Sequence, residues 1–563
     1  MRGPLLPFLL FATTCLSTSA DFRGWMRKVR EEPPLFEIVE GETRSNSPVW
    51  GSFVDRYSTQ GYGFLELYSN ESYSDRDQAF NAGIFEGYAT ADRAIMHYDN
   101  LWKQYCAHQV DSCVKLFQFI GATLNYMQQQ ATELAVKDPY WHQVDMVLTQ
   151  LNAISAGITA RQNKVRFFSP QDVDITRANM LLFLNLDGEV DDIEARLRPV
   201  TTSGVNVDEP MAGRRADSAL VKLLPGNKDL LLSHVSGGPY AGMTKILKKY
   251  SLNLHTSAKS KKKIAGRVHA TSSSPGKLTS GDDFYLLSNG LALMSTGIEV
   301  HNNSLYRFIT PNCVFEFVRA IVANRLATSA TEWINIYSKN PSGTNSKQWM
   351  IVDYNKFKPA QQIPDGLLWI MESLPGFTHT EDVSAVLRKQ SYWPSYNIPY
   401  SSLMFQLSGA PFNVQKYGDW FTYDKHPRAQ IFKRDHIKVV DTGSMVKLMR
   451  YNGFKEDPAS KCVCIPPFSA TNGISARSDL NILMGRYPFP ALGPASRGGI
   501  DMKLTNTSLA VGLQFIAVAG PTQDLQPPFR WSTSGFHDPH DGQPDLWNFT
   551  TFVWTWGKGH CQP

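Results

Sequence analysis

The chain has 563 residues, of which 42% are hydrophobic and 19% charged, and its formal net charge is +5. These values exclude a disordered chain and allow one large core or two. A net charge this small for the length also argues against a dedicated nucleic-acid binder, which would concentrate basic residues on one face. We therefore expect a globular protein with no nucleic-acid partner.

Residues 1–20 have the pattern of a secretory signal peptide. Arg2 supplies the positive charge, residues 5–15 are mostly apolar, and residues 18–20 are small. The mature chain is expected to begin near Asp21. No later run reaches the roughly 18 apolar residues that a membrane span needs, so no transmembrane segment is predicted. The sequence thus predicts a soluble protein of a lumenal compartment or the extracellular space.

Cysteines and glycosylation sequons fit such a compartment. Without Cys15 an even number of cysteines remains, which predicts disulfides, and Cys106 and Cys113 are near enough to staple a helix-loop-helix corner. Cys462 and Cys464 look too close for an easy mutual bridge, so at least one is expected to pair elsewhere, with zinc binding as the alternative. The disulfide candidates are Cys106, Cys113, Cys313, Cys462, Cys464 and Cys561, and the sequons predict glycans at Asn70, Asn302, Asn506 and Asn548.

The hydrophobic pattern predicts alternating β-rich and helical stretches. Residues 48–69 are typical of two strands joined by a turn at 58–61, and residues from 77 to about 162 have helical periodicity. Residues 201–215 are polar and predict an exposed linker. Three later elements follow: a β-hairpin around a Pro-Gly-Asn turn at 225–227, a helix over 240–250 and a strand over 282–288.

The hairpin sequence also carries a family resemblance. Residues 217–226 read DSALVKLLPG. This run closely resembles the start of the catalytic chain in the phospholipase B-like family of lysosomal and secreted proteins, whose pattern is Cys-Ser-Ala-Leu-(Ile/Val)-Lys-x-Leu-Pro-Gly. Later runs resembling the family are YWPSYN at 392–397, PRA at 427–429, FKRD at 432–435, MRYN at 449–452 and PFRW at 528–531.

The resemblance spans roughly residues 45–550 and implies a fold and an activity. Members of this family are N-terminal nucleophile hydrolases, so we expect an α+β protein built as a four-layer αββα sandwich. It would form one integrated unit, with residues 21–216 as the family's smaller fragment and residues 217–563 carrying the hairpin and most of the sandwich. The implied reaction is hydrolysis of an acyl ester or amide bond in phospholipids or other lipids.

Asp217 stands where the family has its nucleophilic Cys. In N-terminal nucleophile hydrolases, cleavage of the chain exposes a Cys, Ser or Thr whose own α-amino group acts as the base. A carboxylate is a weak nucleophile toward carbonyls and cannot easily perform the acyl shift behind self-cleavage. We therefore predict no autocatalytic cut before Asp217. Ser218 is the alternative nucleophile, although neighbouring side chains on a strand point to opposite faces.

Other candidate site residues follow from the same resemblance. The family tends to have His-x-(Ser/Thr)-Trp after the hairpin. This chain has His234 and Ser236 at the first and third positions but Gly237 in place of the Trp, and the family's Thr-Thr pair is here Thr296-Gly297. Arg319 and Asn324 lie in a helix that resembles the family's Arg-x-x-x-Ala-Asn pattern and are the candidate ligand contacts.

Three functions stay open from the sequence. The first is an active hydrolase with an unusual residue at the nucleophile position, and the second a catalytically impaired family member that binds a lipid or acylated small molecule. The third is a structural role in the extracellular space. The chain has no Gly-x-Ser-x-Gly elbow, His-Glu-x-x-His zinc helix or phosphate-binding loop, so no metal or cofactor is expected, and a homo-oligomer is left open.

Overall fold

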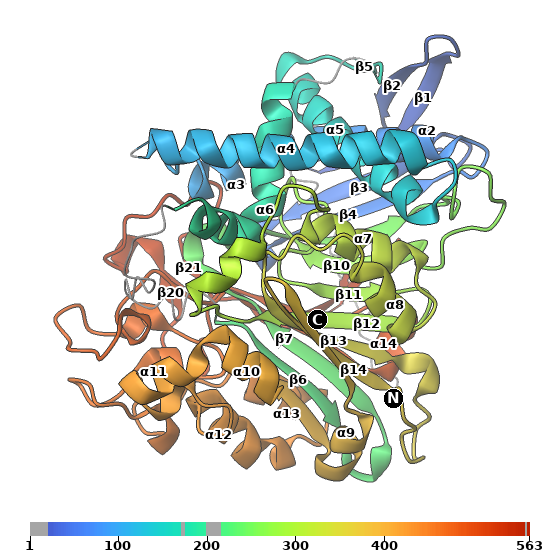
Figure 1. The fold of residues 1–563 in the computed structure, drawn as a ribbon. Helices are drawn as coiled ribbons and strands as arrows, with labels where there is room; N and C mark the ends of the chain where they lie inside the picture. The colour runs from blue at the N-terminus through green and yellow to red at the C-terminus, as the bar shows by residue number, and fades with distance from the viewer. Residues whose placement is uncertain (1–20, 108, 171–174, 199–215, 558–559, 563) are drawn as a thin grey trace, which may run out of the picture.

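The computed structural model describes residues 21–107, 109–170, 175–198, 216–557 and 560–562 (Figure 1). The predicted signal peptide, Cys15 and the 201–215 linker lie outside these residues, and so does the side chain of Cys561. The described chain mixes α-helices with two large β-sheets, which is compatible with the expected α+β class. Within it, no helix combines the length and apolarity needed to cross a bilayer.

The larger sheet has twelve strands, and all neighbours are antiparallel except β4 and β9, which are parallel. In spatial order they are β15 (Phe377–Asp382), β14 (Leu368–Leu374), β13 (Lys347–Asp353), β12 (Leu291–Gly297), β11 (Phe284–Leu287), β10 (Val268–Ser273), β9 (Lys245–Ser251), β4 (Tyr62–Ser69), β3 (Val49–Arg56), β1 (Phe22–Arg30), β2 (Leu35–Glu40) and β5 (Phe167–Phe168).

The second sheet has seven antiparallel strands, and the predicted hairpin lies near one edge of it. In spatial order they are β16 (Tyr392–Ser395), β6 (Ser218–Leu223), β7 (Leu230–Val235), β18 (Asp501–Thr505), β19 (Ile516–Ala519), β22 (Phe552–Thr555) and β23 (His560–Gln562). Two short pairs complete the strands: β8 (Gly237–Pro239) with β17 (Arg497–Gly499), and β20 (Phe529–Arg530) with β21 (Leu546–Trp547).

The two sheets pack face to face, and helices cover both outer faces (Figure 1). Between the sheets, Phe64 of β4 stacks on Trp554 of β22 with ring centroids 3.6 Å apart. The helices on the larger sheet are α2 (Asp75–Ala89), α3 (Ala91–Leu101), α4 (Val110–Leu134), α5 (Pro139–Asn163), α6 (Ile175–Leu197), α7 (Glu316–Leu326) and α8 (Ala330–Tyr337). Those at the smaller sheet include α9 (Ser384–Gln390), α10 (Ser402–Ser408), α11 (Ala410–Tyr417), α12 (Pro427–Asp435) and α13 (Thr442–Met449), while α1 (Tyr57–Gln60) and α14 (Thr507–Val511) are single turns.

Several sequence predictions are confirmed in this architecture. The 48–69 segment forms β3 and β4, the 77–162 segment forms helices, and the 217–235 segment forms the β6–β7 hairpin. Cys106 and Cys113 are bonded and join the segment after α3 to the first turn of α4. The sequon residue Asn548 is exposed, and Asn70, Asn302 and Asn506 are half-buried.

Two predictions were wrong. The expected helix over 240–250 is instead a short turn followed by β9, because this segment pairs with β4 on one side and β10 on the other. Ile246 and Tyr250 pack in one core while Leu247 packs in the core between the sheets, which is strand alternation. Cys462 and Cys464 bond to each other, since their Cα atoms are 5.2 Å apart and within bridging range, while Cys313 is a buried thiol.

Helices α2 and α5 touch backbone to backbone. A Cβ atom on Gly87 would lie 2.1 Å from the carbonyl oxygen of Ile154, and one on Gly83 would lie 2.3 Å from that of Gln150. Real side chains never approach so closely, so glycine at these positions sets the distance between the two helices.

We predict that Gly87→Ala destabilises the fold by about 1–3 kcal/mol, because the added methyl group must push α2 away from α5. Gly121→Ala is the matched control. Nothing lies within 4 Å of a Cβ at that half-buried position of α4, so the change should stabilise the helix by up to about 1 kcal/mol. Urea unfolding of both variants measures the difference, and equal free energies of unfolding would contradict the tight packing of α2 on α5.

Candidate active site

A cavity of about 530 Å³ opens where the ends of strands from both sheets meet helix α3. Asp217 and Ser236 line it from the hairpin side, and Lys245, Asp282 and Lys347 line it from the larger sheet and its loops. Half-buried apolar side chains of Leu101, Trp102 and Tyr105 form another part of the wall. The cavity is therefore amphipathic, with charged groups in one part and aromatic surface in another.

The half-buried carboxylate of Asp217 is held by three N–H donors. Oδ1 accepts from the backbone N–H of Gly237 at 2.9 Å, and Oδ2 accepts from the backbone N–H of Gly297 and from Nδ2 of Asn397, both at 3.3 Å. Arg428 of α12 donates to the carbonyl oxygen of Asp217, and its other Nη donates to Oδ1 of Asn397 at 2.8 Å. Donors of this kind can stabilise an oxyanion, and here they face the carboxylate of the chain itself.

Gly237 accommodates the residue that precedes Asp217. A Cβ atom on Gly237 would lie 2.3 Å from the carbonyl carbon and 2.5 Å from the nitrogen of Ala216. Any side chain here would collide with the backbone of Ala216. Ala216 thus occupies the space beside the Cα atom of Gly237.

Ser218 points away from this cavity. Its Oγ donates to the carbonyl oxygen of Ile474 at 2.7 Å and accepts from Arg428 at 3.2 Å, so it faces the layer that contains α12. It is fully buried there. The strand alternation expected from the sequence therefore places Asp217, and not Ser218, on the cavity side.

His234 is buried behind the cavity wall. Its Nε2 donates to the carbonyl oxygen of Ser295 at 2.8 Å, and the side chain is 0% exposed. Burial, together with the nearby ammonium group of Lys503, lowers the pKa of His234 to about 4. His234 is thus a neutral, structurally held imidazole near pH 7.

Ser236 touches a buried cluster of charges. Its Oγ donates to Asp282 at 2.9 Å and accepts from Lys503, whose ammonium also lies 2.7 Å from Asp282 and 2.8 Å from Asp501. Lys245 lies 3.0 Å from Asp282 on another side. Burial alone would raise the pKa of Asp282, but the two lysines hold it well below its usual value, so Asp282 is ionised.

The remaining predicted residues have structural surroundings. Thr296 is buried and its Oγ1 shares a 2.6 Å hydrogen bond with Oγ of Ser395. On α7, Arg319 donates to the carbonyl oxygen of Tyr337 at 2.7 Å, and Oδ1 of Asn324 accepts from Nε1 of Trp333 at 2.7 Å. None of the three is among the residues that line the cavity at Asp217.

Sequence reasoning missed the residues that surround Asp217. Asn397 and Arg428 lie in runs that resemble family signatures, and Asp282 opens the predicted strand over 282–288, but none was assigned a role. Lys245 and Lys503 lie next to apolar residues in strands β9 and β18, and both are buried and paired with carboxylates, but no short sequence motif marks them.

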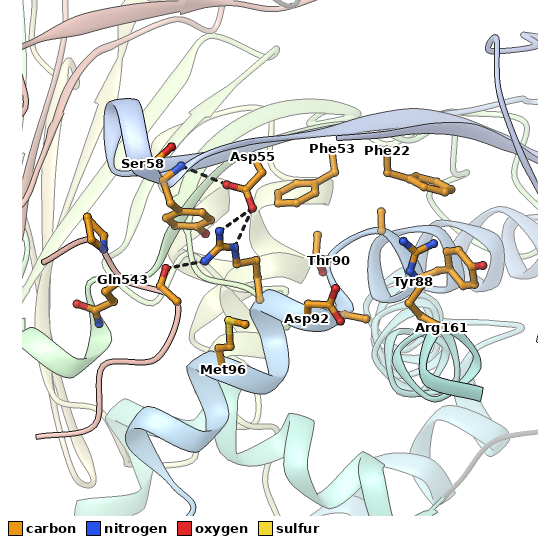
Figure 2. A pocket seen from close by; sticks show the side chains of 16 residues that line it. Phe22, Phe53, Asp55, Ser58, Tyr88, Thr90, Asp92, Met96, Arg161 and Gln543 are labelled. Carbon is orange, nitrogen blue, oxygen red and sulfur yellow. Dashed lines mark hydrogen bonds and ion pairs between the residues drawn. The ribbon is translucent and has the colours of Figure 1, made fainter. Parts of the chain in front are cut away.

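A second cavity of about 520 Å³ lies between strands β1 and β3, the start of α3 and the loop at 542–544. Arg93 is one of the residues that line it, and its guanidinium pairs with Asp55 at 2.8 Å and donates to the carbonyl oxygen of Gly542 at 2.6 Å. Figure 2 shows this cavity with Asp55 and Met96 among the side chains in its wall. None of the site residues predicted from the sequence lines this cavity.

Comparison with known proteins identifies the family. The Phospholipase B family model matches residues 49–554. "Putative phospholipase B-like 2" from Rattus norvegicus is 40% identical over 553 residues, covering 95% of this chain and 92% of that protein. The protein of the same name from Homo sapiens is 40% identical, covering 92% and 87%. "Phospholipase B-like protein B" from Dictyostelium discoideum is 34% identical, covering 91% and 86%. The chain belongs to the phospholipase B family.

We predict that Gly237→Ala lowers the melting temperature, because the methyl group must displace the backbone of Ala216 at a cost of about 1–3 kcal/mol. Gly238→Ala is the neighbouring control, since the closest atom to its Cβ is a methyl carbon of Ile500 at 3.5 Å. Thermal unfolding compares the two variants. Equal melting temperatures would show that the backbone of Ala216 can shift without loss of stability.

Acidification is expected to destabilise the fold through His234. Its pKa is about 4 when folded and 6.5 when unfolded, so between these values the unfolded chain binds the proton first. The contribution of His234 is fully present above pH 6.5 and is lost as the pH falls toward 4, at up to about 1.4 kcal/mol per pH unit.

Urea unfolding at steps between these pH values measures this loss. His234→Gln should flatten the pH dependence, whereas His537→Gln, at an exposed turn, should leave it as in the wild type. An identical slope in all three proteins would refute a neutral buried His234.

Proposed function

We propose that this protein hydrolyses acyl ester or amide bonds of phospholipids or related lipids, with the cavity at Asp217 as its active site. Family membership over most of the chain supports a hydrolase. The lining of the cavity is the observation that supports this site and a lipid substrate. It brings Asp217 and ammonium groups together with apolar surface, as an acyl amphiphile requires. The four-layer packing supports the N-terminal nucleophile hydrolase fold that the family resemblance implies.

In this proposal Asp217 acts as a general base. Its carboxylate takes a proton from a water molecule, whose oxygen bonds to the acyl carbonyl carbon. The bond from that carbon to the leaving alcohol oxygen then breaks, and the oxygen takes the proton back from Asp217. Lys347 lines the same cavity, and its positive charge would stabilise the oxyanion of the tetrahedral intermediate.

We predict that Asp217→Asn lowers kcat by about 100-fold or more, because the amide keeps the size of the side chain but cannot accept the proton. Ser218→Ala is the matched control and should keep wild-type turnover, since Ser218 faces the opposite side of the strand. Release of fatty acid from a lysophospholipid measures both. Loss of turnover in Ser218→Ala alone would assign catalysis to the serine and overturn the role of Asp217.

A second candidate function is binding of a lipid or acylated ligand without turnover. The contacts of Asp217 favour it, because donors that could stabilise a substrate oxyanion already hold the carboxylate.

Intact mass and lipid extraction separate the candidates. The deglycosylated, reduced protein should give one species beginning near Asp21, whereas a fragment that begins at Asp217 or Ser218 would show that the maturation cut survives. Co-purified lipid together with no turnover by the wild type would favour the binding function. Asp217→Cys should then restore both the maturation cut and the hydrolysis if Asp217 alone prevents them.

The cellular location remains part of the proposal. The signal-like residues 1–20, the two disulfides and the sequons support a secreted or lysosomal glycoprotein. The ligand would be a lipid or acylated small molecule, and assembly into a homo-oligomer is left open.

A further inference from the structure

His97 is the least satisfied polar side chain in the wall of the cavity at Asp217. It lies on α3, is 1% exposed and lines the cavity. Neither ring nitrogen has a hydrogen-bond partner in the part of the chain that the structure describes. A neutral imidazole carries one N–H donor and one acceptor, and burying them unpaired costs free energy that a ligand in the cavity would recover.

The electrostatic surroundings of His97 are positive. Burial lowers the pKa of His97 well below its usual value, and the ammonium groups of Lys277, Lys245 and Lys248 lower it further. Lys245 and Lys277 line the same cavity as His97. Counter-charges are near as well: Asp282 lies 3.0 Å from Lys245, and Glu86 lies 2.7 Å from Lys248. These carboxylates compensate Lys245 and Lys248, and the lowered pKa of His97 keeps its imidazole neutral, with one N–H donor.

Helix α3 places an apolar wall next to this basic corner. Leu101 follows His97 by four residues, so both side chains lie on the same face about 6 Å apart along the axis. Trp102 and Tyr105 continue the wall, with ring centroids 5.0 Å apart. A ligand that reaches both parts of the cavity would therefore be an amphiphile with a negatively charged head.

We propose that His97, Lys245 and Lys277 form an oxyanion subsite that binds the phosphate group of an amphiphilic ligand. A phosphate oxygen accepts the N–H of His97 and pairs with the lysine ammonium groups, while the apolar part of the ligand lies along Leu101, Trp102 and Tyr105. The subsite rests on the proposed function for the choice of cavity, and it adds which end of the ligand binds where.

Calorimetric binding to the full-length protein tests the subsite without any turnover. The probes are octyl phosphate, octyl glucoside and inorganic phosphate, none of which has a carboxylic ester or amide bond. Octyl phosphate should bind at least about 10-fold more tightly than octyl glucoside, because charge-assisted hydrogen bonds exceed neutral ones. If inorganic phosphate bound as tightly as octyl phosphate, the subsite would stand, but its ligand would be a free anion and not an amphiphile. Equal binding of octyl phosphate and octyl glucoside would overturn the subsite.

Two variants and a control locate the effect. Lys277→Gln and His97→Gln should each weaken the binding of octyl phosphate by roughly 10-fold and leave the binding of octyl glucoside unchanged. Lys358→Gln removes the same charge from an exposed position and should change neither. Unchanged octyl phosphate binding in a folded Lys277→Gln protein would overturn the proposal even if His97→Gln fails to fold. Because no probe is hydrolysed, an inactive enzyme would not alter these outcomes.

Discussion

The hydrogen bonds around the Asp217 carboxylate join the two sheets at the edge of the cavity. Asp217 immediately precedes β6 of the smaller sheet, whereas Gly297 is the last residue of β12 in the larger one. Asn397 follows β16 and is itself held by Arg428 of α12, so the outer helical layer also contributes. A single side chain thus fixes three layers relative to one another, and the shape of the cavity depends on it.

Buried charge is the second constraint on the cavity. Lys245, Lys503, Asp282 and Asp501 all lie within the fold, and removing one partner would leave an uncompensated charge, which typically costs about 3–5 kcal/mol. Two positive and two negative groups balance in this cluster, and Ser236 takes a hydrogen bond on its cavity side. The cluster therefore keeps a polar surface next to Asp217 at little net charge.

The sequence predicted what depends on local pattern. The β6–β7 hairpin was recognisable from two apolar runs around a Pro-Gly-Asn turn, and the Cys106–Cys113 bridge from its short spacing. The 240–250 segment was misassigned because Met243, Ile246, Leu247 and Tyr250 fit a helical spacing. Pairing with β4, nearly two hundred residues earlier in the chain, decided the outcome. His97 lines the cavity, while Asn397 and Lys503 contact Asp217 and Asp282 in its wall. Only tertiary structure brings these distant segments together.

Asp217 and Gly237 are physically linked at this site. The carboxylate at 217 needs a donor, and the N–H of Gly237 supplies one at 2.9 Å. The backbone of Ala216 packs against Gly237 as well, since any Cβ there would meet it. A side chain at 237 would displace Ala216 and, with it, the backbone that positions Asp217. The hydrogen bonds of the Asp217 carboxylate therefore depend on glycine at 237.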